Sequence, residues 1–145
     1  DSPNYKVYHC PADHSAIYNN PGVQRIRSYS MDEYLGYPAG KATYPGLPMK
    51  IDEIKYNTSA IFLFLDEIEG GIDDGMFGIQ LTEQNWINMP AQRHNYGANL
   101  SFCDGHVERW KWKYQKIWRY PGSPVVNNPD SLDLQRLQAA LPSMN

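Results

Sequence analysis

The chain has 145 residues, of which 41% are hydrophobic and 20% charged, and its formal net charge is −3. This composition is typical of one globular domain over residues 1–145 and excludes an intrinsically disordered chain. The small negative charge gives no reason to expect nucleic acid or an anionic membrane surface as a partner. The 11 Tyr and 4 Trp suit either an irregular core or a sugar-binding surface.

The first part of the chain is rich in loops. Tyr5–Tyr8 predicts a short strand, and Ile26–Met31 predicts another. Between them, residues 14–27 are polar and contain an Asn-Asn-Pro-Gly turn cluster. Residues 35–48 hold several glycines and prolines, and we predict a long loop there.

A continuous apolar run, Ala60–Leu65, follows a single helical turn predicted within Met49–Tyr56. Its length and its aromatic and β-branched residues favour a strand over a helix. Because the run does not alternate, we predict a strand at the centre of a sheet, buried on both faces. Met76–Leu81 predicts the next strand, and Trp86 is expected to anchor the connection that comes after it.

A hairpin is predicted next, with strands Ala98–Cys103 and His106–Trp112 on either side of Asp104-Gly105. Asp-Gly between two alternating runs indicates a two-residue type I′ turn. In that register Phe102 faces Val107, and both lie on one apolar face with Leu100.

The chain ends with an aromatic, proline-bearing loop and then a helix, predicted over Asp130–Leu141. Asp130 or Ser131 can cap it, and three leucines spaced along it form one apolar face. The order of elements predicts an α+β fold, with an antiparallel sheet of about four strands, long loops and a C-terminal helix.

Five motifs occur in a fixed order along the chain. His94 is followed, nine residues later, by Asp104-Gly105. The other four are Cys10-Pro11, Ser28–Met31, Phe64–Glu67 with the later Asp74-Gly75, and the terminal Leu134–Pro142. Together they resemble a family of bacterial prepilin-like proteins, the type II secretion-type pseudopilins with a C-terminal H-X9-DG segment.

This resemblance implies a pilin-like globular domain whose sheet packs on a long apolar N-terminal helix. It implies a structural or assembly subunit of a pilus-like or type II secretion-type filament, with other pilin-like subunits as partners. The location would be extracytoplasmic, and membrane contact would come only through the N-terminal helix. The sequence has no run of about 20 apolar residues, so we expect it to be the globular part of a longer protein.

Two cysteines, Cys10 and Cys103, allow one disulfide, which an exported chain would permit. The resemblance implies an alternative, in which Cys10 pairs with a cysteine near the N-terminal helix and is a free thiol here.

Two groups of residues are candidates for binding Ca²⁺ or another divalent metal. The acidic, glycine-containing segment 66–75 is oxygen-rich and suits Ca²⁺ through Asp66, Glu67 and Asp74, although a solvated acidic turn is the simpler interpretation. The resemblance adds to the calcium hypothesis, because some major pseudopilins hold calcium in a loop. Alternatively, His94, Asp104 and His106 could gather with Asp66 and bind a transition metal, or serve the turn and the loop backbone structurally.

Aromatic residues near the hairpin suggest a second function. Trp110, Trp112, Tyr114 and Trp118 could form a face that binds polysaccharide. A third hypothesis is a metal-dependent or polysaccharide-cleaving site around His94. The chain has none of the nucleophile or phosphate-loop motifs that would favour an enzyme, so the filament hypothesis ranks first.

Overall fold

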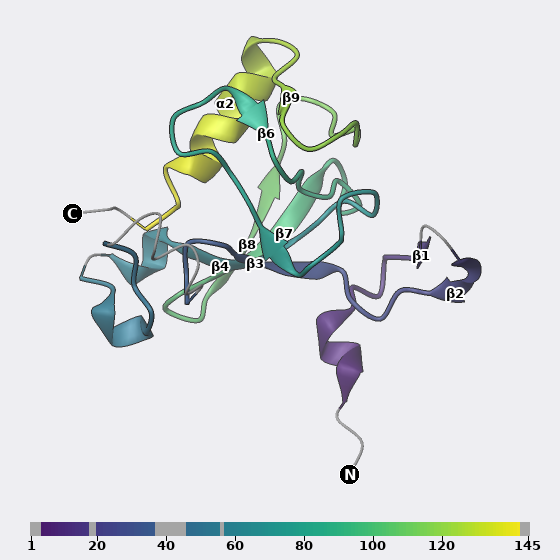
Figure 1. Cartoon of the computed structure of the whole chain (residues 1–145), viewed down its shortest axis with the longest axis horizontal. Coiled ribbons are helices and arrows are strands. Elements are labelled where there is room, and N and C mark those ends of the chain that lie inside the picture. Colours follow the sequence, from purple (N-terminus) through teal and green to yellow (C-terminus); the bar gives the residue numbers. More distant parts are fainter. Residues whose placement is uncertain (1–3, 18–19, 37–45, 56, 143–145) are drawn as a thin grey trace.

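The computed structural model describes residues 4–17, 20–36, 46–55 and 57–142, and combines a five-stranded sheet with a C-terminal helix (Figure 1). In chain order the elements are η1 (Tyr5–Tyr8), β1 (Ala16–Ile17), β2 (Asn20–Gln24), β3 (Tyr29–Asp32), η2 (Ile51–Glu53), η3 (Thr58–Ala60), β4 (Phe62–Asp66), β5 (Met76–Phe77), β6 (Asn85–Trp86), β7 (Gly97–Phe102), β8 (Val107–Lys111), β9 (Ser123–Pro124) and α2 (Asn128–Gln138). None of the helices in these ranges is long and apolar enough to cross a membrane.

The main sheet has the strand order β5-β3-β4-β7-β8, so β4 is central, as predicted. The α+β class and the C-terminal helix are confirmed, but the sheet has five strands rather than four. It is also not wholly antiparallel, because β5 pairs with β3 in parallel. Both edges of β4 are already paired, one with β3 and the other with β7. The later strand β5 therefore pairs with the free edge of β3.

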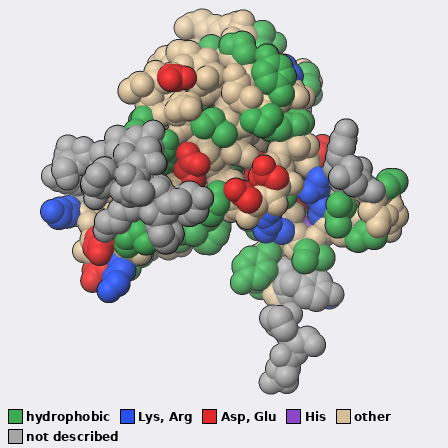
Figure 2. Space-filling view, viewed as in Figure 1, with side chains coloured by type: hydrophobic (Ala, Val, Ile, Leu, Met, Phe, Trp, Pro, Cys, Tyr) green, Lys and Arg blue, Asp and Glu red, His purple; other side chains and the backbone are tan. Residues whose placement is uncertain are grey.

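The two faces of the sheet have different surroundings. Figure 1 shows α2 on one side of the sheet and η1 on the other. The core lies on the α2 side, where Phe62, Leu100, Leu134 and Leu137 are fully buried. Trp86 is also fully buried, which confirms its predicted role as an anchor. On the face shown in Figure 2, acidic and basic side chains lie in small separate groups.

The predicted hairpin is present, but its register is shifted by one residue. Ser101 lies opposite Val107, and the Phe102 N–H donates to the His106 carbonyl at 2.9 Å. The loop therefore contains Cys103 as well as Asp104 and Gly105. Gly105, at φ 93°, takes the left-handed conformation that three-residue hairpin loops need.

The shift moves Val107 to the other face of the sheet, because side chains alternate along a strand. Val107 is 66% exposed, whereas Phe102 is 3% exposed. The predicted Phe102–Val107 pair is therefore wrong. Phe102 stacks instead on His106, with 4.3 Å between ring centroids.

Several local predictions also need correction. Tyr5–Tyr8 forms a 3-10 helix rather than a strand, and the strand predicted over Met76–Leu81 covers only its first two residues. The central strand is not buried on both faces, since Phe64 is 39% exposed. Most of the predicted loop 35–48 lies outside the described residues. Both cysteines are buried and free, so no disulfide joins them.

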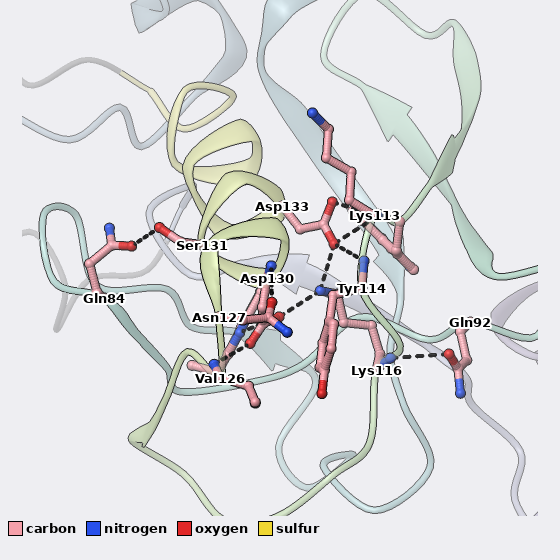
Figure 3. Close-up of polar contacts among 12 residues, drawn as sticks. Gln84, Gln92, Lys113, Tyr114, Lys116, Val126, Asn127, Asp130, Ser131 and Asp133 are labelled. Atoms are coloured by element: carbon pink, nitrogen blue, oxygen red, sulfur yellow. Dashed lines mark hydrogen bonds and ion pairs between the residues drawn. The ribbon is translucent and has the colours of Figure 1, made fainter.

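The C-terminal helix is attached by a buried group of charges. The Lys116 ammonium lies 2.8 Å from Asp130 Oδ1 and 2.8 Å from Asp133 Oδ2, and all three side chains are buried. Figure 3 shows both aspartates pointing from α2 towards the 113–116 segment. The helix begins at Asn128, earlier than predicted, so its N-cap is Asn127, whose side chain accepts from the Asp130 N–H, and not Asp130 or Ser131.

We expect Lys116→Met to lower the free energy of unfolding by about 3–5 kcal/mol, because it leaves two buried carboxylates without their cation. Urea unfolding measures this change. Lys113→Met is the control, since that side chain is exposed and its loss should cost less than about 0.5 kcal/mol. Equal stability of the two variants would contradict the assignment.

We expect Gly105→Val to cost about 1–2 kcal/mol, because a β-branched residue is strained at positive φ. A Cβ at Gly105 would meet nothing within 4 Å, so the cost is one of backbone conformation. Thermal unfolding measures this cost. Gly22→Val is the control for a general effect of valine, because Gly22 lies at an exposed strand position without positive φ. A Gly105→Val protein as stable as wild type would refute the turn geometry.

Candidate functional site

Among the residues that the structure describes, Cys10, Asp66 and His94 form a group whose sulfur, oxygen and nitrogen atoms all lie within 4.8 Å of one another. They come from distant parts of the sequence: the segment before β1, the end of β4 and the loop before β7. Cys10 and Asp66 are 1% and 0% exposed, while the His94 side chain is 21% exposed. The group is thus buried with one edge open to solvent.

Hydrogen bonds of the backbone N–H groups hold the segments that carry Cys10 and His94. The Cys10 N–H donates to Ser28 Oγ, and the Ser28 N–H donates to the Tyr8 carbonyl, which ties the N-terminal segment to the start of β3. The His94 N–H donates to the Gly97 carbonyl across a tight loop. Asn95 and Tyr96 in that loop both have positive φ, an unusual conformation for residues with side chains.

His94 contacts the other two side chains through a single atom. Its Nε2 lies 3.3 Å from Cys10 Sγ and 2.9 Å from Asp66 Oδ2. An imidazole nitrogen carries either one hydrogen or one lone pair, so it cannot satisfy both neighbours. Asp66 Oδ2 is buried, and His94 Nε2 is the one donor that the described residues place within reach of it. A hydrogen on Nε2 can therefore serve Asp66 or Cys10, but not both.

Arg93 supplies the cation on the far side of Asp66. It pairs with Asp66 Oδ1, donates to the Glu67 carbonyl at 3.0 Å and lies 3.6 Å from Asp13 Oδ2. Burial raises the pKa of Asp66, although Arg93 and His94 both act against the rise. Burial also acts to raise the pKa of Asp13, but hydrogen bonds from Ser28 and Ser15 outweigh it and lower that pKa.

Of the residues predicted to bind metal, only Asp66 and His94 meet here. Glu67 is buried in a separate network, where its carboxylate accepts from Ser30 Oγ and, at 2.8 Å, from Asn88 Nδ2. Burial raises the pKa of Glu67 to about 8 despite those bonds. Asp74 is exposed and accepts from the Met76 N–H, which is a turn contact.

Asp104 and His106 form their own pair at the hairpin tip. His106 Nδ1 lies 2.5 Å from Asp104 Oδ1, and Nε2 lies 3.3 Å from Glu108 Oε1. The hydrogen bond with Asp104 raises the pKa of His106, and hydrogen bonds from His106 lower the pKa of Asp104. The expected gathering of both residues with Asp66 does not occur, because the tight turn pairs them locally.

The predicted aromatic face is largely a core feature. Trp110 and Trp112 are 6% and 5% exposed. The Trp112 Nε1–H donates to the Ala91 carbonyl, and the Arg136 guanidinium of α2 lies 3.7 Å from the Trp110 ring centre. Trp118 packs on Gly70, where an added Cβ would come within 2.3 Å of its ring. Tyr114 is half-buried. These rings offer little surface on which a sugar could stack.

The three donor atoms could hold a metal ion. A thiol, an imidazole and a carboxylate are typical ligands of Zn²⁺ and related ions. A Cys-His-Asp catalytic relay needs the cysteine and the aspartate on opposite ring nitrogens, whereas here both contact Nε2. Cys10 is the residue that sequence reasoning missed, although three of the five motifs, Cys-Pro, Leu-Asp-Glu and the signature histidine, each supply one member.

Comparison with protein-family models, curated proteins and solved structures gives no match to this chain. Its function must therefore be argued from its own residues and from the motifs.

We expect Arg93→Met to destabilise the fold by about 3–5 kcal/mol, because it leaves the buried Asp66 carboxylate without a cation. Arg109→Met is the matched control, since Arg109 is exposed and its side chain donates to the His94 carbonyl rather than to a buried carboxylate. Chemical unfolding in the presence of a chelator measures both. Losses that agree within about 1 kcal/mol would show that Asp66 does not depend on Arg93.

Proposed function

We propose that this chain is the globular, extracytoplasmic domain of a pilin-like filament subunit. Two lines support the proposal: the five motifs in order, and a sheet with one face covered by α2 and the other face open. The observation that carries it is an apolar groove of about 350 Å³ on the open face. The groove is lined by Val7, Tyr8, Tyr29, Phe64, Asn99, Leu100, Ser101 and Val107.

The groove has the chemistry of a helix-binding surface. Val7, Tyr8 and Val107 are more than half exposed, and Phe64 is 39% exposed. Exposed apolar groups gathered on one face of a protein mark a contact surface. In the pilin-like arrangement this face of the sheet receives a long apolar helix, and η1 lines the groove from the N-terminal side. We propose that such a helix, from a pilin-like subunit, occupies the groove.

The apolar face of the hairpin was predicted to consist of Leu100, Phe102 and Val107. The changed register alters that set, because α2 and the core bury Leu100 and Phe102, and Val107 joins Phe64 on the opposite face. The alternative function, polysaccharide binding or cleavage, has less support, since Trp110 and Trp112 are core residues; of the four predicted aromatic residues, Trp118 lines a pocket, one of about 390 Å³.

Photo-cross-linking from single positions tests the proposal. A photoreactive residue at Val107, in the protein expressed from its own gene in the source cells, should capture peptides of a pilin-like N-terminal helix, identified by mass spectrometry. The matched control is Val126, which is 49% exposed and does not line the groove. We expect several-fold more captured helix from Val107.

Two results would overturn the filament proposal. One is equal capture from Val107 and Val126. The other is capture from Val107 of a chain without a pilin-like helix.

A further inference from the structure

We infer that Cys10, Asp66 and His94 together bind one zinc ion within a single chain. The inference does not depend on the filament proposal, because all three ligands belong to the same chain and no partner is needed to complete the set. It rests on convergent donor atoms, on the competition of two of them for one imidazole nitrogen and on the excess of negative charge around them.

Two of the three donor-to-donor distances are close to those that a tetrahedral zinc site requires, and the third, from Cys10 Sγ to Asp66 Oδ2, is within 4.8 Å. Bonds of about 2.3 Å to sulfur and 2.0 Å to nitrogen and oxygen place sulfur and nitrogen about 3.5 Å apart, and nitrogen and oxygen about 3.3 Å apart. The observed separations from His94 Nε2 are 3.3 Å to Cys10 Sγ and 2.9 Å to Asp66 Oδ2. Each needs to open by less than half an ångström, a shift within the reach of side-chain rotation.

A metal ion would also resolve the bonding conflict at His94. Without it, Nε2 faces both a sulfur and a carboxylate oxygen and can donate its one hydrogen to only one of them. With it, the Nε2 lone pair, the thiolate and Oδ2 could all bind one cation. Binding would thus replace the competition for one hydrogen with a bond from each donor atom.

The charges around the group favour a divalent cation. A Cys10 thiolate and the Asp66 carboxylate together balance the two positive charges of Zn²⁺. Arg93 is the cation beside this group, and it contacts three carboxylates, those of Asp66, Asp13 and Glu69. The excess of negative charge attracts a divalent cation.

The donor types select zinc over the hard cations. Thiolate sulfur is a poor ligand for Ca²⁺ and Mg²⁺, which bind oxygen, and a good one for Zn²⁺. Two outer contacts hold the ligand residues: Arg93 pairs with Asp66 Oδ1, and the Cys10 N–H donates to Ser28 Oγ at 3.2 Å. Such contacts orient ligands and strengthen binding. The ion can enter at the partly exposed edge of His94, where water would supply a fourth ligand.

Zinc binding would join three segments of the chain. The ion would fasten the segment that contains Cys10 to the end of β4 and to the loop before β7. Val7 and Tyr8, in that same segment, form one wall of the apolar groove. Zinc would therefore fix that wall in place, and we assign the site a structural role.

The test is metal binding to the purified chain after removal of metals with a chelator. Calorimetric titration with ZnCl₂ should give one ion per chain, and titration with CoCl₂ should give the sulfur-to-cobalt absorption of a thiolate ligand. Cys10→Ser and His94→Gln should each weaken zinc binding by more than the about 10–100-fold that loss of an outer contact costs, and Cys10→Ser should abolish the thiolate absorption.

The chain supplies a matched control for each ligand. Cys103→Ser changes the other buried cysteine, and His106→Gln changes the histidine of the hairpin tip. Both should bind zinc as wild type does. Unaltered binding by Cys10→Ser or His94→Gln, or its loss in His106→Gln, would overturn the assignment, as would the absence of stoichiometric binding by wild type.

X-ray absorption at the zinc edge covers the case in which a ligand variant does not fold. On the unaltered chain it should show one sulfur among nitrogen and oxygen ligands. A shell made of nitrogen and oxygen alone would place the ion elsewhere and refute the site.

Discussion

One buried carboxylate, Asp66, holds together the end of the sheet where the distant segments of this chain meet. It ends the central strand and is fully buried, so its charge must be balanced locally. Arg93 provides that balance, and the Ala91 N–H donates to the Asp66 carbonyl at 2.7 Å. The loop before β7 is thereby fixed against β4, and His94 is brought to the Cys10 thiol. The position of Asp66 therefore determines where the three members of the candidate site meet.

A second buried group of charges attaches α2 to the other face of the sheet. Lys116 binds both aspartates of α2, and its ammonium also lies 4.9 Å from the centre of the Trp86 ring. These contacts hold the helix over the hairpin and the core. As a result one face of the sheet is closed by the chain itself, and the other, with Phe64 and Val107, stays open. That asymmetry is the physical basis for the proposed helix-binding groove.

Local signals in the sequence were sufficient for the elements that depend on local chemistry. The apolar run predicted β4, the Asp-Gly pair predicted the hairpin, and the leucine spacing predicted α2. The hairpin register could not be predicted from those signals, because Asp-Gly fits a two-residue loop as well as the three-residue loop that forms. That one residue decides whether Val107 is buried or exposed.

The site was predictable only in part, because its members are far apart in the sequence. Asp66 and His94 were both candidates, but Cys10 lies 84 residues from His94, and only the fold brings them together. Glu67 was predicted as a metal ligand together with Asp66 for a related reason, since the sequence does not show that its carboxylate points into a separate buried network. Lys116 gave no signal either, because a lysine in an aromatic loop is usually exposed.

Anomalous diffraction at the zinc edge, from crystals grown with zinc, tests most directly the claim that Asp66 organises a metal-binding junction. The account predicts an anomalous peak between Cys10 Sγ, Asp66 Oδ2 and His94 Nε2, with Arg93 still on Asp66 Oδ1. An empty junction in those crystals, or a peak only at Asp104 and His106, would contradict it.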